Sequence, residues 1–255
     1  MSQPRVAEVI ADELRVRIVD GELADGDLLP RQEDLVQEFG VSLPSLREAM
    51  RILETEGLIS VRRGNIGGAV VHRPTPQAAA FMLGLVLQSH NVVLSDLGAA
   101  LRVVEPACAS LCSQQADRRA IAGRLKALTV EAAAHLDDGP EFTRISREFH
   151  DELARACGNE TLRQLVGTLE TLWSDYESRW ADASTKRGAY PNVELRNLVV
   201  AAHTNIANAI RLGDVEAAEK ATRHHLEESQ QFLLENAGNQ RLAITQLRGG
   251  FGSRL

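Results

Sequence analysis

Three histidines lie on the apolar faces of three separate predicted helices. They are His150 in residues 140–157, His203 in 192–211 and His225 in 214–237. A buried imidazole needs hydrogen-bond partners for its ring nitrogens, and neutral imidazole is a good ligand for zinc and similar ions. The residues leave two interpretations open: one shared divalent metal, or three separate core histidines that each bond a backbone carbonyl. Periodicity alone favours the second interpretation.

Arg102 is a candidate for binding an anionic effector. A guanidinium group pairs with a carboxylate through two hydrogen bonds. The alternative is a structural pair with Glu105, three residues further along the same predicted helix. A metal with an open position beside an arginine would suit a small organic acid.

A second set of candidate residues lies in the first 75 residues and suits DNA. A short predicted helix at about 31–39 is followed by Val41, by Ser42 as a good N-cap, and by a helix that ends before Gly57. Two β-like runs at 58–62 and 69–72 follow, joined by the glycine-rich segment RGNIGG. This order predicts a winged helix-turn-helix.

Such a fold assigns roles to individual side chains. One helix enters the major groove, and its N-terminal residues reach base edges. Arg47 is the best candidate to read a base and Arg51 can reach phosphate, while small wing residues would let arginines approach the minor groove. The expected DNA-binding residues are Arg31, Ser42, Ser45, Arg47, Arg51, Arg62, Arg63 and Gly64. Each arginine alone could equally be ordinary surface charge.

The charge balance gives no independent support for DNA binding. The chain of 255 residues has a net charge of −7, and residues 1–75 hold nine arginines against thirteen Asp and Glu. Any binding to DNA must therefore depend on where the positive charge lies.

The remaining composition indicates a cytoplasmic protein of two domains. No apolar run approaches the ~20 residues of a membrane span, and the N-terminus has no signal-peptide pattern, so no membrane partner is expected. The three cysteines are expected to be reduced core residues.

The fold class is mainly α: a winged helix-turn-helix at 1–75, an antiparallel all-helical bundle at 76–237, and a partly disordered tail at 238–255. The bundle helices are expected at about 77–89, 95–115, 117–136, 140–157, 160–182, 192–211 and 214–237.

The segment LLPRQEDLVQEFGVSLPSLREAMRILETEGLISVRRGNIGGAVV resembles the winged helix-turn-helix of the GntR family. The resemblance implies a homodimer that contacts a short palindromic operator in double-stranded DNA. It places Ser42, Ser45, Arg47 and Gly64 at DNA-contact positions and Arg63 in the wing. Two features depart from the family. Glu33 stands where an arginine is usual, so that Arg31 would take over its phosphate contact, and Leu43-Pro44 replace polar or basic residues.

Segments at 95–115, 144–159 and 200–226 resemble the FCD effector domain of the FadR branch of that family. The resemblance implies a divalent metal, zinc or similar, bound by His150, His203 and His225, with an acidic residue one helical turn before the first histidine. Ser146 stands at that position. Serine is a poor metal ligand, so water or an effector carboxylate would fill the gap, or metal affinity would fall. His224 lies off the apolar face and is expected to be exposed.

The predicted function is a transcription regulator, most simply a repressor, whose DNA affinity is controlled by a small carboxylate effector near the metal. A metal-responsive or an acyl-CoA-responsive regulator of the same fold stays open. An enzyme is the alternative from another class, since three histidines and an open position could activate water. That hypothesis lacks a general base and leaves residues 28–72 without a role, so no enzyme activity is expected.

Overall fold

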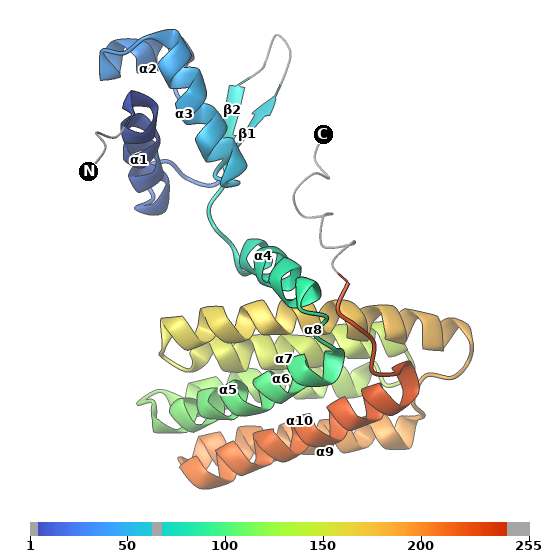
Figure 1. The fold of residues 1–255 in the computed structure, drawn as a ribbon. Coiled ribbons are helices and arrows are strands. Elements are labelled where there is room, and N and C mark those ends of the chain that lie inside the picture. The colour runs from blue at the N-terminus through green and yellow to red at the C-terminus, as the bar shows by residue number, and fades with distance from the viewer. Residues whose placement is uncertain (1–4, 63–67, 244–255) are drawn as a thin grey trace. The chain divides into compact units, whose positions relative to one another are not determined.

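The computed structural model describes residues 5–62 and 68–243 and forms two compact units, residues 1–78 and 79–255 (Figure 1). The first unit contains α1 (Val6–Val19), α2 (Gln32–Phe39), α3 (Leu43–Thr55), β1 (Ile59–Arg62) and β2 (Gly68–Val71). The helices that follow are α4 (Pro76–Ser89), α5 (Leu94–Gln114), α6 (Arg118–Ala134), α7 (Gly139–Ala156), α8 (Glu160–Lys186), α9 (Val193–Leu212) and α10 (Val215–Ala237).

The first unit has its own apolar core. Ile10, Leu14 and Ile18 recur at helical spacing along α1, and all three are buried in one cluster with the apolar face of α3. Leu46 and Leu53 of α3 are fully buried in the same cluster. The face of α3 opposite these residues is consequently free of the core.

The turn between α2 and α3 has a clear local cause. Gly40 ends α2 with φ 61° and ψ 37°, a left-handed conformation that glycine adopts at low cost. Ser42 then caps α3, because its Oγ accepts a hydrogen bond from the Ser45 N–H at 3.4 Å. Pro44 lies in the first turn of α3, where a missing N–H is harmless.

The strands β1 and β2 form an antiparallel hairpin beside α3. Ile59 pairs with Val71, and Arg62 pairs with Gly68 at the end that residues 63–67 connect. The Leu29 N–H donates to the Ala69 carbonyl at 2.8 Å, which joins the strand pair to the segment before α2. The predicted winged helix-turn-helix is confirmed in its described part. Arg63 and Gly64 lie outside the described residues.

The second unit is a bundle of antiparallel helices (Figure 1). Helix α5 packs against α10 and α8, α9 against α6 and α10, and α7 against α6 and α8. The mainly helical fold expected from the sequence is confirmed. No helix in the described ranges is both long and apolar enough to span a membrane.

The three cysteines belong to the bundle core. Cys108, Cys112 and Cys157 are all free and buried in the cluster that contains Phe149 and Leu153. Burial raises the pKa of Cys112 to about 12. These thiols therefore act as apolar packing groups, in keeping with the expectation of reduced core cysteines.

Residues 238–243 pack on the bundle, although the sequence placed them in a tail. The Leu94 N–H donates to the Gln240 carbonyl and the Leu242 N–H donates to the Val92 carbonyl, both at 2.9 Å. Leu242 is only 3% exposed and joins the apolar cluster around Trp173. This short strap, residues 238–243, is therefore part of the second unit.

Candidate nucleic-acid interface and metal centre

Helix α3 presents Arg47 and Arg51 to solvent. Both side chains are exposed, on the face opposite the buried Leu46 and Leu53. Arg47 Nε donates to Gln32 Oε1 at 3.4 Å, a long contact that ties it weakly to α2. Arg51 Nη1 lies 3.1 Å from Glu48 Oε2 in an exposed ion pair, which contributes little stability and is free to exchange for phosphate.

Both serines predicted to contact DNA lie at the N-terminus of α3. The Oγ atoms of Ser42 and Ser45 are 3.0 Å apart, so each is held in place while Ser42 remains exposed. Leu43 and Pro44 are also exposed in this first turn. The first turn of α3, which would enter a DNA groove, therefore carries smaller and less polar side chains than the family resemblance alone would suggest.

The remaining arginines of the first unit fall into two groups. Arg15 pairs with Glu56 at 2.7 Å, and Arg17 pairs with Glu38 at the same distance, so two positive charges are neutralised within the unit. Within residues 5–62 and 68–78, the exposed Arg31, Arg47 and Arg62 form no ion pair. Arg5 and Arg73, also exposed, form no ion pair in this part of the chain either, so the uncompensated positive charge includes the places where the sequence predicted contact with DNA and is not confined to them.

The three predicted metal ligands come together in the bundle. His225 Nε2 lies 3.1 Å from His203 Nε2 and 3.3 Å from His150 Nε2. One ligand nitrogen from each ring lies within 4.8 Å of the other two. None of the three rings bonds a backbone carbonyl in the described part of the chain, so the interpretation as three separate core histidines is wrong.

Neighbouring side chains hold two of the rings in position. His150 Nδ1 lies 2.5 Å from Glu105 Oε1, a fully buried carboxylate, which directs Nε2 of His150 toward the other two rings. The His203 ring stacks on Phe149 with centroids 3.9 Å apart and planes within 5°. Glu105 therefore pairs with His150, and the alternative pair of Glu105 with Arg102 is not formed.

Burial and charge set the protonation of the three imidazoles. Burial and the neighbouring His150 lower the pKa of His225 to about 3, and burial with both other rings lowers the pKa of His203 well below its usual value. Burial also opposes the charged form of His150, but the Glu105 carboxylate outweighs it and raises the pKa of His150 to about 9. His203 and His225 therefore present neutral imidazoles at pH 7.

The geometry fits a divalent metal. Zinc–nitrogen bonds of 2.0–2.1 Å in a tetrahedral site place ligand nitrogens about 3.3 Å apart, close to the two shortest distances in this cluster. Ser146 Oγ lies one helical turn before His150 and is buried without a hydrogen-bond partner. The residues that would hold the ion are His150, His203 and His225, and Ser146 adds a polar atom at the same wall.

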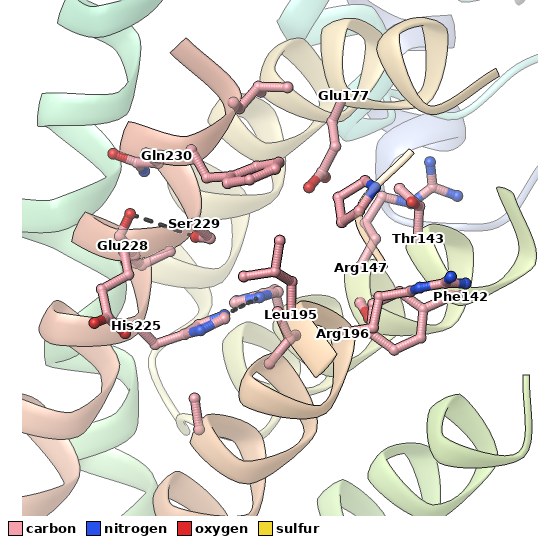
Figure 2. Close-up of a pocket in the computed structure, with 18 of the residues that line it drawn as sticks. Phe142, Thr143, Arg147, Glu177, Leu195, Arg196, His225, Glu228, Ser229 and Gln230 are labelled. Carbon is pink, nitrogen blue, oxygen red and sulfur yellow. Dashed lines mark hydrogen bonds between the residues drawn. The ribbon is translucent and has the colours of Figure 1, made fainter. Parts of the chain in front are cut away.

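The histidine cluster opens into a cavity of about 260 Å³ within the second unit. Its lining combines aromatic, aliphatic and charged side chains from α7, α8, α9 and α10. Figure 2 shows Arg147, Glu177, Leu195 and His225 around this space. The sequence-predicted Ser146 is among the lining residues.

Arg102 does not line this cavity. Its Nη1 donates to Gln230 Oε1 behind the wall, and its carbonyl accepts a hydrogen bond from Arg223 at 2.8 Å. The arginines that do line the cavity are Arg147 and Arg196. Two arginines that the sequence analysis did not predict thus line the cavity. Arg102, which it did predict, lies outside the lining.

Among the other lining residues that the sequence analysis did not predict, four lie on α8. Glu170, Trp173, Glu177 and Trp180 follow one another at intervals of three and four residues and therefore share one helical face. The available signal was two acidic residues on the same face as two tryptophans. Helix α8 continues to Lys186 rather than ending at 182 as predicted, and Trp180 lies in its C-terminal part.

Comparison with known proteins agrees with this arrangement. The family model described as bacterial regulatory proteins, gntR family, matches residues 6–70, and the FCD domain model matches residues 96–228. The chain is 28% identical over 233 residues to the HTH-type transcriptional repressor NanR of Cronobacter sakazakii, which covers 89% of this chain and 84% of that protein. The repressor of the same name from Salmonella schwarzengrund is also 28% identical over 233 residues, covering 89% and 83%.

Among solved structures, the Streptococcus agalactiae GntR protein has a similar fold. Its TM-score is 0.67 at 23% sequence identity, with 89% of this chain and 99% of that chain covered. The matched family and relatives are transcription regulators rather than enzymes, as the sequence predicts. The chain therefore belongs to the GntR family of bacterial regulatory proteins, as a DNA-binding transcription regulator that carries an FCD domain.

Proposed function

We propose that this chain is a repressor whose operator affinity is controlled by a small carboxylate bound beside a divalent metal. The observation that carries the proposal is the convergence of His150, His203 and His225 at the wall of the cavity. Residues 1–75 would bind DNA and residues 76–237 would bind the effector. The assignment as a repressor follows the printed names of the NanR relatives.

The metal would supply a Lewis acid with coordination positions left open toward the cavity. Three imidazoles leave at least one position of a four-coordinate ion for another ligand. Ser146 Oγ, which has no partner, can donate a hydrogen bond to an effector oxygen there. Arg147 and Arg196 provide positive charge on the α7 and α9 sides of the cavity and favour an acid over a neutral ligand.

The DNA-binding surface would consist of the exposed arginines and the N-terminus of α3. A palindromic operator requires two copies of α3, so the active form would be a homodimer. Effector binding would alter operator affinity only by as much as the effector binds the DNA-competent and DNA-incompetent states differently.

The metal is tested by titrating zinc into the EDTA-treated full chain, with calorimetry and elemental analysis as measurements. We expect one zinc ion per chain, and at least a tenfold loss of affinity in each of His150→Ala, His203→Ala and His225→Ala. The matched control is His224→Ala, since His224 is exposed and pairs only with Glu228 at 3.3 Å among the described residues. Stoichiometric tight zinc in all three variants would refute the site.

The regulatory role is tested by selecting duplexes from a random DNA library with the full chain. Fluorescence anisotropy on a selected duplex then measures affinity with zinc alone, with zinc plus a panel of short carboxylic acids, and with acyl-CoA. A change caused by acids supports the proposal. A response to zinc alone indicates a metal-responsive regulator, a response only to acyl-CoA indicates that class of effector, and failure to select any duplex overturns the proposal.

A further inference from the structure

Helix α8 lines one side of the cavity with alternating acidic and aromatic side chains. Glu170, Trp173, Glu177 and Trp180 all contribute to the lining, and their spacing places them on one face of the helix. We call these four residues the acidic–aromatic face. Nothing in the binding of a simple carboxylate calls for two acids at this position, because like charges repel.

Neither acid of this face has a binding partner within the described ranges. Glu170 is 6% exposed, yet its carboxylate forms no hydrogen bond and no ion pair there. Burial, with the nearby Glu105 carboxylate, raises the pKa of Glu170 well above its usual value, and burial raises that of Glu177. Burial of an unpaired carboxylate is costly, so natural proteins keep one mainly where a ligand or ion satisfies it.

The cations that face these two acids form no ion pair with them in the described part of the chain. Arg147 Nη1 donates to Ser178 at 3.5 Å and lies close enough to Glu177 only for longer-range attraction. Arg196 Nε donates to the Asn192 carbonyl at 3.3 Å, and its guanidinium lies 5.3 Å from the Tyr190 ring centre. His150, the remaining cationic neighbour, is held by Glu105.

The acidic side chains of α8 face the space in which a ligand would bind. Figure 2 shows Glu177 pointing from α8 into the open space, on the opposite side from Leu195 and His225. Trp180 packs against Tyr190 and Phe232, with ring centres 5.6 and 5.9 Å away, which fixes its indole beside Glu177 on the same wall. Gln230 is 1% exposed and its buried Nε2 lacks a partner, so the cavity has further unused polar capacity.

Carboxylates between aromatic rings are a recognised arrangement for binding a cationic nitrogen. The carboxylates supply charge and accept N–H hydrogen bonds, while the faces of tryptophan rings attract cations. We propose that the effector is a zwitterion, a small acid that also carries a protonated amine, and that Glu170 and Glu177 bind the amine against Trp173 and Trp180. This inference rests on the proposed function, which assigns the effector's carboxylate to the histidine and arginine side of the cavity.

The test compares matched acids that differ only in the amine. Zinc-loaded full-length chain is titrated by calorimetry with 4-aminobutanoate against butanoate, and with 6-aminohexanoate against hexanoate. We expect at least one amino acid to bind tenfold or more tightly than its amine-free partner. Glu170→Gln and Glu177→Gln should each reduce that preference at least tenfold, without weakening the binding of the amine-free acid, because each removes a negative charge that repels it.

Asp182→Asn is the matched control, because Asp182 lies on the same helix and is exposed. It should leave the preference for the amine intact. In the ligand-free chain, Glu170→Gln should raise the thermal midpoint, since it removes an unpaired buried acid. A purely structural role for this acid would lower it.

Three results would overturn the inference. One is equal binding of both members at each chain length, and another is an undiminished amine preference in the two glutamine variants. The third is loss of zinc from Glu170→Gln, which would assign Glu170 to the metal. In each of these cases the proposed function survives, because zinc and an acid still bind the unaltered chain; if neither binds, the proposed function fails as well.

Discussion

At the scale of single residues, the arginines of the first unit differ in whether a carboxylate neutralises them. Arg15 and Arg17 are neutralised by Glu56 and Glu38, whereas Arg31, Arg47 and Arg62 form no ion pair within the described part of that unit. An acidic domain can thus expose arginines that no carboxylate pairs with. The sign of the net charge therefore says little about whether this domain binds DNA.

The Arg47→Ala variant tests base reading. We expect it to weaken binding to a selected duplex by about 1–3 kcal/mol without loss of stability, because the side chain is exposed and bonds only Gln32 weakly. Anisotropy titration and urea unfolding measure the two effects. Arg73→Ala is the control, since Arg73 is exposed but lies beyond the hairpin. Unaltered affinity in Arg47→Ala would remove this residue from the interface.

Tyr190 gives a prediction in pH. Burial raises the pKa of Tyr190 to about 12 from a usual value of 10.0, although a hydrogen bond with Thr143 at 2.6 Å partly offsets the rise. The unfolded chain ionises its tyrosine first, so the contribution of Tyr190 to stability is complete below pH 10 and is lost as the pH rises toward 12.

The measurement is urea unfolding of the full chain and of Tyr190→Phe at pH 9 and pH 11. The unaltered chain should lose more stability between these pH values than the variant, which has no phenol at this position. A parallel absorbance titration at 295 nm should lose its high-pH component in the variant. Equal losses of stability in both proteins would show that Tyr190 is not buried as described.

At the scale of elements, the turn between α2 and α3 sets the direction of the recognition helix. Gly40 adopts φ 61°, and a Cβ there would meet open space, so only backbone strain opposes a side chain. Gly40→Ala should lower the free energy of unfolding by about 1 kcal/mol. Gly123→Ala is the matched opposite: it lies in the middle of α6 with open space around it, and should raise stability by up to about 1 kcal/mol. Urea unfolding, analysed as a two-state transition, measures the change in stability of both variants. A change of the same sign in the two variants would contradict the assignment of strain to Gly40.

The elements also show what sequence patterns could and could not predict. The cap signal at Ser42 depends on local backbone chemistry, and the helices predicted after Ser42 and from residue 160 begin where α3 and α8 do. The shared orientation of His150, His203 and His225 followed from helical periodicity, but their mutual proximity depends on how three helices pack, which the pattern alone left open. The family resemblance was needed to choose between the two interpretations.

Arg102 illustrates the opposite limit. Its type and position in an R-x-x-E pattern suited anion binding, but the packing of α5 against α10 turns it toward Gln230, outside the cavity. Arg147 lay unnoticed because it is flanked by other charged residues in the sequence, and no local pattern distinguishes a cavity arginine from a surface one. The lining of a site formed by four helices is a property of tertiary packing.

At the scale of the whole molecule, a net charge of −7 opposes binding to DNA of arbitrary sequence. Non-specific binding depends on phosphate neutralisation and has dissociation constants of about 10⁻⁴–10⁻⁶ M at physiological salt. We expect the dissociation constant of this chain at the weak end, about 10⁻⁴ M in 150 mM salt, since its acidic residues outnumber its basic ones. Anisotropy with an unrelated duplex measures it, and Arg62→Ala should reduce the salt slope on a selected duplex by about one. Tight, salt-sensitive binding to unrelated DNA would contradict this account.

The strap formed by residues 238–243 has a consequence for biosynthesis. Leu242 completes the apolar cluster around Trp173, and Gln240 satisfies the N–H of Leu94 at the start of α5. During translation the first unit leaves the ribosome early and already holds all of its own core. The helical unit must wait for residue 242 before its last core position is filled, so a nascent chain would carry a finished DNA-binding domain for some time before it could respond to a small molecule.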